Sequence, residues 1–488
     1  METIRIEAAD WAIVWDPERE RHVYRRDVDV WLAGDRIVHI GPGYAGGASR
    51  TLSGRGRLAM PGLVDLHSHL ASENMGRGVT EEVGTPALYM TGVHEPKPLF
   101  LPGHSMSTGF LADPAEGMRA ATRMAVAELL LSGTTTVVDL GVSYDGWLDT
   151  LAETGIRAVV GYMYRSAAWV VRDGHRVDYA WDEGAGRAGL ETASAWVERA
   201  GAHPSGRLSG LLSPAQVDTC SAELLTESAA RAEALGVPLT LHTCQSVWDL
   251  LELTRRHGLT PVQWLAGLGV LSPRMVLGHA MFLDHHSAVP WHSREDVGLI
   301  AASGASVAHC PTVMSRYGQT LESLGGYLRA GINVTLGTDT QPHNMLEEAR
   351  TATILSRIGG HHVHDHGLGE VFHAATVGGA RALGRDDLGR IAPGAKADLV
   401  LVDLTHPAMR PVRDPLRSLV YSAADRAVRD VFVDGRQVVR DGKVTTIDRD
   451  AAATVVEALQ RDVLANVSAR DRAGRGAEEI SPLSLALE

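Results

Sequence analysis

The chain has 488 residues, of which 44% are hydrophobic, and carries a formal net charge of −13. This length allows one large core and a second, smaller module. The acidic surplus argues against a nucleic-acid or anionic-membrane partner, because polyanions are bound by basic surfaces. No apolar run reaches the roughly 18 residues of a membrane span, and the opening stretch lacks the apolar core of a signal peptide. Three scattered cysteines are typical of a reducing compartment, so we expect a cytoplasmic protein.

Residues 1–60 contain short alternating strand patterns with glycine turns. From residue 61 onward, β-branched runs alternate with longer amphipathic helical patterns. The runs are residues 62–66, 134–141, 157–165, 207–214, 238–243, 275–280, 305–311 and 333–339. Near-continuous apolar strands that alternate with helices predict a parallel sheet covered on both faces, and eight of them predict a (β/α)8 TIM-like barrel. A doubly wound open sheet is the competing arrangement.

After Gly394 the chain returns to alternating strands, and a charged helical tail begins near Asp448. Two β-rich halves that flank a barrel most simply form one small β-sandwich domain. We therefore predict an α/β protein in three segments. Residues 1–60 are one half of the sandwich, residues 61–392 are the barrel, and residues 393–488 are the other half with the helical tail.

Polar residues stand where the predicted strands end. His67 and His69 end the first strand, and the later strand ends carry His242, His279 and Asp339. The C-terminal ends of barrel strands form the active-site rim, and residues two apart along a strand share a face. Three or four imidazoles with one carboxylate suit Zn²⁺, with Fe²⁺ or Mn²⁺ as alternatives. An isolated His-x-His pair can be explained as two polar histidines with satisfied hydrogen bonds. The presence of all five residues at strand ends instead predicts one metal ion per chain.

Several segments resemble the amidohydrolase superfamily, in the branch of s-triazine hydrolases and adenosine-type and guanine-type aminohydrolases. They are PGLVDLHSH, LTLHTCQS, VLGHA, VAHCP, VTLGTDTQPHNM and LGRIAPGAKADLVLVDL, and the resemblance covers nearly the whole chain. It implies a (β/α)8 barrel with a terminal β-sandwich and one divalent metal that activates water. It also implies that the metal ligands are His67, His69, His242 and Asp339. Asp339 would take the proton from the water, and His279 would bond the water or the oxyanion.

Some superfamily members bridge two metals with a carbamylated lysine on the fourth strand. The only lysines here are Lys97, Lys396 and Lys443, and none lies in the predicted fourth strand. The composition therefore excludes a lysine-bridged binuclear centre.

One position departs from the family pattern. Deaminase-like members carry a glutamate three residues after the fifth-strand histidine, and this chain has Gln245 there. An amide can orient a substrate but cannot shuttle a proton at neutral pH. Either another acid substitutes or the reaction needs no ring protonation. The candidate substitutes are Glu73, Glu81, Glu82, His104 and His343.

Residues near the rim are expected to contact the substrate. They are Gln245, His309, His343 and Asn344, although a buried structural role for His309 is nearly as consistent with the sequence. The long segment after the first strand, residues 80–110, is typical of a lid or specificity loop. Tyr89, Phe100 and Trp169 are candidates for stacking on a flat ring.

The predicted function is a mononuclear metal hydrolase whose activated water attacks a C–N bond of a small nitrogenous ring compound, by deamination or a related hydrolysis. The alternatives are hydrolysis of a cyclic amide or imide, and displacement of a halide or other ring substituent without ring protonation. A non-catalytic metal-binding barrel is less well supported, because structural zinc sites are normally closed by protein ligands. We expect a small-molecule substrate and a homo-oligomer, most simply a dimer.

Overall fold

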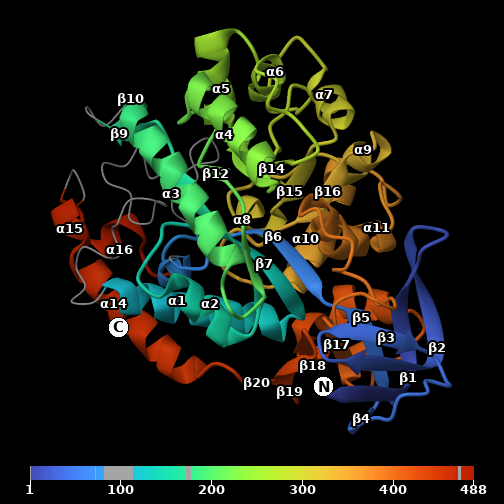
Figure 1. Ribbon diagram of the computed structural model, residues 1–488. Coiled ribbons are helices and arrows are strands. Elements are labelled where there is room, and N and C mark those ends of the chain that lie inside the picture. The colour runs from blue at the N-terminus through green and yellow to red at the C-terminus, as the bar shows by residue number, and fades with distance from the viewer. Residues whose placement is uncertain (1, 72, 82–113, 172–176, 471–473, 488) are drawn as a thin grey trace.

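The computed structural model describes residues 2–71, 73–81, 114–171, 177–470 and 474–487. Parallel strands lie at its centre, helices lie outside them, and a separate β-rich region contains the N-terminus (Figure 1). Within these ranges no helix is long and apolar enough to cross a membrane.

The central strands form two parallel sheets. The first contains β6 (Leu63–Ser68), β7 (Thr134–Gly141), β8 (Arg157–Tyr164), β11 (Leu208–Gly210) and β12 (Ser213–Pro214). The second contains β13 (Leu239–Thr243), β14 (Met275–His279), β15 (Ser306–His309) and β16 (Asn333–Leu336). All eight predicted strands are therefore present, with the fourth divided into β11 and β12. Isolated parallel bridges join the two sheets at both edges, and the bridged pairs are Ser68–Asp339, Leu212–Leu239 and Gln216–His242.

Helices follow most of these strands, as the alternating pattern predicts. They are α1 (Pro114–Leu131), α2 (Trp147–Thr154), α3 (Glu183–Gly201), α4 (Ala222–Leu235), α5 (Val247–His257), α6 (Pro261–Gly267), α7 (Asp296–Ser303), α8 (Pro311–Ser315), α9 (Leu324–Arg329), α10 (Met345–Gly359), α11 (Leu368–His373) and α12 (Gly379–Ala382). The sequence sets their ends: Ser246 and Asp249 form a capping box at the start of α5, and Gly258 ends that helix with a positive φ. An antiparallel hairpin, β9 (Ala167–Val171) with β10 (Val177–Trp181), follows β8 and was not predicted.

Strands from both termini form one nine-stranded sheet. The N-terminal strands are β1 (Thr3–Asp16), β2 (Arg21–Ala33), β3 (Arg36–Ile40), β4 (Arg50–Ser53) and β5 (Arg57–Pro61). The C-terminal strands are β17 (Leu399–Asp403), β18 (Val428–Val433), β19 (Arg436–Arg440) and β20 (Lys443–Val444). Antiparallel pairing of β5 with β17 joins the two groups. The blue and orange-red strands lie side by side in Figure 1.

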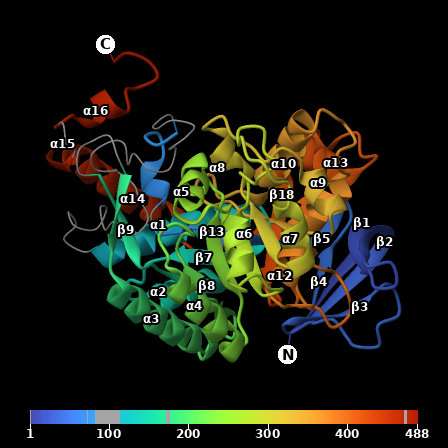
Figure 2. The ribbon, with the colours of Figure 1, turned by 90° about the horizontal axis from the view of Figure 1, so that it is seen from above.

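Short helices complete the C-terminal part. They are α13 (Pro415–Ser418), α14 (Arg449–Ala465), α15 (Val467–Arg470) and α16 (Ala477–Ile480). Helix α14 packs along α1, and α16 lies on the side of the molecule away from β1–β3 (Figure 2). A buried Arg157–Asp398 ion pair links the start of β8 to the residue before β17.

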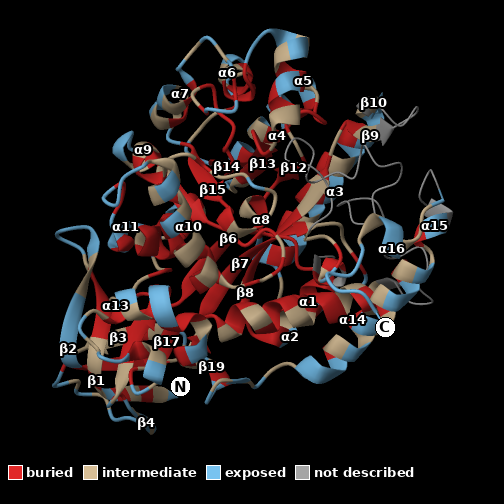
Figure 3. Cartoon of the chain, turned by 180° about the vertical axis from the view of Figure 1, so that it is seen from behind, coloured by how far each residue is buried: buried red, intermediate tan, exposed pale blue. Residues whose placement is uncertain are grey.

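A buried apolar core lies beneath the polar ends of the parallel strands. Figure 3 shows that the parallel strands are buried almost throughout. Side chains between the two sheets form one apolar cluster, which includes Leu66, Leu140, Val159, Leu211 and Val276. These residues precede the polar strand ends, so the apolar cluster forms the floor beneath the histidines.

Candidate metal centre and active site

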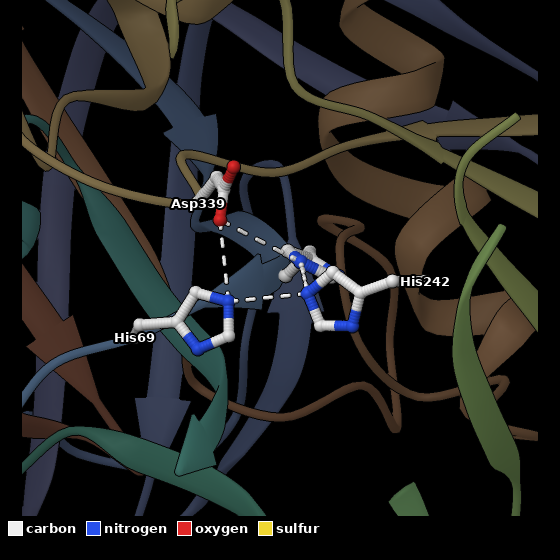
Figure 4. Close-up of side chains that lie close together, drawn as sticks. His69, His242 and Asp339 are labelled. Carbon is white, nitrogen blue, oxygen red and sulfur yellow. Dashed lines mark hydrogen bonds and ion pairs between the residues drawn. The ribbon is translucent and has the colours of Figure 1, made fainter. Parts of the chain in front are cut away.

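Four side chains converge at the C-terminal edge of the parallel strands. His67, His69, His242 and Asp339 each offer one ligand atom, and these atoms all lie within 4.8 Å of one another. Figure 4 shows the rings of His69 and His242 and the carboxylate of Asp339 turned toward one another. The structure therefore brings together all four residues proposed from the sequence as metal ligands.

The distances suit a single small ion. The Nε2 atoms of His67 and His242 are 3.0 Å apart, and those of His242 and His69 are 3.3 Å apart. Asp339 Oδ1 lies 3.2 Å from His69 Nε2 and 3.7 Å from His67 Nε2. Tetrahedral donors that are each about 2.0–2.1 Å from zinc are about 3.3 Å apart. The donor set fits a zinc-sized ion.

Backbone carbonyls orient two of the rings. His69 Nδ1 donates to the carbonyl of Leu140 on β7, and His242 Nδ1 donates to the carbonyl of Ala215, at 2.7 Å in each case. A proton on Nδ1 leaves the Nε2 lone pair free to face an ion. Neighbouring strands therefore select the tautomer that metal binding requires.

Close backbone packing brings the strand ends together. A Cβ on Gly337 would lie 2.7 Å from His67 Cβ, and a Cβ on Gly278 would lie 3.0 Å from His67 Cε1. His279 and Asp339 adopt positive φ values of 69° and 59°. Non-glycine residues rarely adopt this conformation, and it concentrates at functional sites.

A buried carboxyl group ties the first strand to the last. Asp65 accepts hydrogen bonds from the backbone N–H of His67 at 3.1 Å, and from the N–H and hydroxyl of Thr338 at 3.1 and 2.6 Å. Burial raises the pKa of Asp65 to about 7, although its hydrogen bonds lower it. Asp65 and Thr338 were not singled out from the sequence. The sequence nevertheless indicates a role for Asp65, because a lone carboxylate inside an apolar strand requires hydrogen-bond partners.

Burial keeps the histidines neutral. It lowers the pKa of His242 to about 3 and that of His279 to about 4, and neighbouring histidines lower the pKa of His242 further. It also holds the pKa of His67 well below its ordinary value. Burial alone would raise the pKa of Asp339, but the His69 hydrogen bond and the nearby imidazoles hold it well below its usual range. Neutral imidazoles and an ionised carboxylate are the protonation states that bind a cation.

His279 lies beside the cluster. Its ring centroid is 4.9 Å from that of His67 and 5.4 Å from that of His242. Neither ring nitrogen has a hydrogen-bond partner in the described part of the chain, although both are buried. A buried imidazole without a hydrogen-bond partner at this position can form a hydrogen bond with a water molecule or a substrate atom.

Gln245 and His309 are buried at the same edge of the strands. The Gln245 amide nitrogen has no partner among the described residues, and the backbone N–H of Gln245 donates to Asp249. Burial lowers the pKa of His309 to about 3, with His279 as a second cause. Their substrate contacts stay predictions.

The two eighth-loop residues have partners within the protein. His343 Nδ1 lies 3.2 Å from Ser68 Oγ and 3.3 Å from Thr338 Oγ1, so this ring packs behind the ligand-bearing segments. Asn344 Oδ1 accepts from two backbone N–H groups and caps α10. The predicted substrate contact of Asn344 therefore rests on its amide nitrogen alone.

Other predicted residues fall outside the described ranges, and these are Glu82, Tyr89, Phe100 and His104. Trp169 donates to Asp218 Oδ2 at 2.8 Å, and Glu81 accepts from the N–H of Gly78. Neither contact tests the predicted roles, which are ring stacking for Trp169 and proton transfer for Glu81. Lys396 pairs with Asp35 and Asp434 in the terminal sheet, far in sequence from the strand ends that carry the histidines.

Comparison with known proteins assigns the family. The profile of the amidohydrolase family matches residues 58–438. The chain belongs to the amidohydrolase family. This amidohydrolase is 29% identical over 422 residues to a 5'-deoxyadenosine deaminase of Methanothermobacter thermautotrophicus, covering 86% of the chain and 90% of the relative. It is 28% identical over 425 residues to a 5-methylthioadenosine/S-adenosylhomocysteine deaminase of Natronomonas pharaonis, with coverage of 86% and 90%.

Solved structures share the fold of this amidohydrolase. A mutant atrazine chlorohydrolase of Arthrobacter aurescens, complexed with zinc and atraton, superimposes with a TM-score of 0.80 at 25% identity and covers 94% of the chain and 100% of its own. A zinc-bound adenosine deaminase of Xanthomonas campestris gives a TM-score of 0.79 at 24% identity, with coverage of 94% and 98%. The second likeness concerns the fold alone.

Proposed function

We propose that this amidohydrolase holds one divalent metal ion, zinc in the first instance, and hydrolyses a C–N bond of a small nitrogenous ring compound. The observation that carries the proposal is the set of four buried donor atoms within 4.8 Å of one another, with two imidazoles fixed by backbone carbonyls. The residues that would hold the ion are His67, His69, His242 and Asp339. When bound, such an ion supplies a water that is activated near neutral pH.

Residues of the protein itself accept the proton of the attacking water and form hydrogen bonds with the reacting groups. Asp339 is ionised and lies at the shared centre, so it accepts the proton of the attacking water. His279 is neutral, and its two unpartnered nitrogens can bond the water or the developing oxyanion. Gln245 offers an unpartnered amide N–H that can hold the substrate ring but cannot protonate it.

An adenosine-type nucleoside is the first substrate class to test, because the curated relatives are deaminases of such compounds. Displacement of a ring substituent without ring protonation is the second candidate. Gln245 favours it, and so does the likeness to an atrazine chlorohydrolase.

The test combines metal analysis with product detection. Purified protein is expected to contain about one zinc per chain and to release ammonia from adenosine, 5'-deoxyadenosine or 5-methylthioadenosine. His242→Gln should lose both properties, whereas His362→Gln, in an exposed loop, should lose neither. Nucleoside and triazine panels give the opposing result. If the protein binds metal stably but releases no ammonia, chloride or ring-opened product from any of these compounds, the proposed hydrolase activity is wrong.

We further propose a domain organisation, a cellular location and an oligomeric state. The isolated bridges between the two parallel sheets support a (β/α)8 barrel over residues 61–392. Residues 1–60 and 393–488 would form the β-sandwich domain and tail, which the β5–β17 pairing supports. Three free, buried cysteines support a cytoplasmic location. Exposed Ile354 and Ile358 on α10 support a homodimer, which light scattering would test.

A further inference from the structure

The ring of His343 joins the end of β6 to the segment that follows β16. Its Nδ1 atom lies 3.2 Å from the hydroxyl oxygen of Ser68 and 3.3 Å from that of Thr338. Ser68 stands between the first two proposed histidine ligands, and Thr338 directly precedes Asp339. His343 therefore contacts both segments that carry three of the four proposed ligands.

The His343 ring is fully buried and neutral. Burial lowers its pKa to about 3, and the positive charge of Arg77 is the second cause. A neutral imidazole cannot serve as an acid that protonates a substrate ring at pH 7. The contacts of His343 with Ser68 and Thr338 therefore indicate a role in holding these two segments together.

The position of His343 is itself set by Glu128, in the last turn of α1. The Glu128 carboxylate accepts a hydrogen bond from the backbone N–H of His343 at 3.3 Å. Arg77 Nη2 donates to both oxygens of the same carboxylate, at 2.8 and 3.0 Å. Glu128 therefore joins α1 to the segment that follows β6 and to the segment that follows β16.

Arg77 is held from two further sides. It follows the short helix η1 (Glu73–Gly76), and its Nη2 atom also donates to Asn74 Oδ1 at 3.0 Å. Asn74 Nδ2 in turn donates to the carbonyl of Ala121 on α1 at 3.2 Å. The carbonyl of Arg77 accepts from Gln460 Nε2 of α14 at 2.8 Å, and α14 packs along α1 (Figure 1). The contacts from α1 and α14 fix the arginine beside Glu128.

The Arg77–Glu128 ion pair is placed to act on the metal centre more than on stability. The side chains are 40% and 25% exposed, and partly exposed ion pairs add little to the free energy of unfolding. The hydrogen bonds nevertheless continue from the pair through His343 to residues beside the proposed ligands. Loss of an outer partner of a metal ligand typically weakens metal binding or activity about 10- to 100-fold.

We propose that Arg77 and Glu128 form a positioning pair, which acts through His343 on the segments that carry the proposed metal ligands. This inference rests on the proposed function, because it assumes that these ligands hold one divalent ion. In this role the pair contacts neither the ion nor the substrate. There are two competing explanations. The pair only stabilises α1, or His343 contacts the substrate through its buried Nε2, which has no partner among the described residues.

Zinc affinity, measured by competition with a chelator, tests the proposal. Glu128→Ala should bind zinc about 10-fold more weakly than the wild type, at the lower end of the expected range because the pair acts through an intervening residue. The zinc-saturated variant should lose kcat by a similar factor with little change in KM, because the pair does not contact substrate. The Tm of the metal-free variant should change little.

Glu153→Ala is the matched control. Glu153 pairs with Arg123 of the same helix α1 at 3.1 Å, and both side chains are partly exposed. In the described part of the chain, neither side chain of this pair bonds to a segment that carries a proposed ligand. Glu153→Ala should therefore keep the zinc affinity and kcat of the wild type.

Two further variants separate positioning from folding. Glu128→Gln keeps an oxygen that can accept hydrogen bonds from His343 and Arg77, so it should recover most of the zinc affinity that Glu128→Ala loses. Arg77→Ala should also weaken zinc binding. Since both residues act through one contact, the double alanine variant should bind zinc no more weakly than Glu128→Ala alone.

Failure of the positioning pair is distinguishable from failure of the proposed function. If the wild type binds no zinc, the proposed function is wrong and the pair falls with it. If the wild type binds zinc and Glu128→Ala matches Glu153→Ala in zinc affinity and kcat, the positioning pair alone is wrong. A lower Tm of metal-free Glu128→Ala with unchanged zinc affinity would assign the pair to the stability of α1. A higher KM with unchanged zinc affinity would place His343 against the substrate, and each of these two results overturns the positioning role.

Discussion

Replacement of Gly337 by alanine tests whether the metal centre depends on close contact between β16 and β6. The added Cβ would lie 2.7 Å from His67 Cβ, 2.8 Å from the His67 carbonyl oxygen and 2.9 Å from the His67 nitrogen. Ordinary contact between such atoms is about 3.5–4.0 Å. The two segments must therefore separate by about 1 Å, and no side-chain rotation relieves the clash because two of the three atoms are backbone.

The separation acts directly on the ligands. Asp339 follows two residues later, and its N–H donates to the His67 carbonyl at 2.7 Å. A shift of about 1 Å at a reacting group costs roughly 100-fold in rate, and overpacking costs about 1–3 kcal/mol of stability. We expect Gly337→Ala to lower kcat about 100-fold, to weaken metal retention and to lower Tm.

Gly298→Ala is the matched control. Gly298 lies in α7, and a Cβ there would meet no atom within 4 Å. Alanine should leave kcat and metal content unchanged and raise stability by up to about 1 kcal/mol through helix propensity. The assay compares zinc per chain, kcat and thermal unfolding for both variants and the wild type. Wild-type turnover and metal content in Gly337→Ala would refute the argument that this contact positions the ligands.

Three further predictions concern single side chains. Asp339→Asn should lower kcat by about 10²- to 10⁴-fold with little change in substrate affinity, because an amide cannot accept the proton; an unchanged kcat would remove Asp339 from the mechanism. Gln245→Glu should be neutral or harmful if the leaving group needs no ring proton, whereas higher activity with a new acidic limb in the pH profile would contradict this expectation and favour ring protonation. The His309 pKa is about 3 when folded and 6.5 ordinarily, so the unfolded state binds the proton first and stability is lost as pH falls from 6.5 toward 3. At pH 5 this loss is about 2 kcal/mol, and His309→Gln should therefore show a smaller fall in Tm between pH 7.5 and pH 5; an identical fall would exclude a buried neutral His309.

The sequence by itself determined which residues stand at the strand ends. His67, His242, His279 and Asp339 each follow an apolar β-branched run, and this local pattern suffices because strand direction and length fix which residue reaches the edge. The family resemblance extended this to ligand roles. The resemblance also identified Gln245 as a departure from the family motif, because motifs can be compared from the sequence alone.

Only the tertiary structure decided how these side chains are held. The carbonyls of Leu140 and Ala215 select the ring tautomers, and carbonyls carry no sequence signal. Asn344, expected near substrate, uses its oxygen to cap α10, because the helix starts directly after it. The buried Asp218 carboxylate accepts hydrogen bonds from Trp169 and Tyr179, which lie 49 and 39 positions earlier in the chain. Local patterns place a residue on a strand or loop, but hydrogen-bond partners come from elements distant in sequence, and packing alone sets those partners.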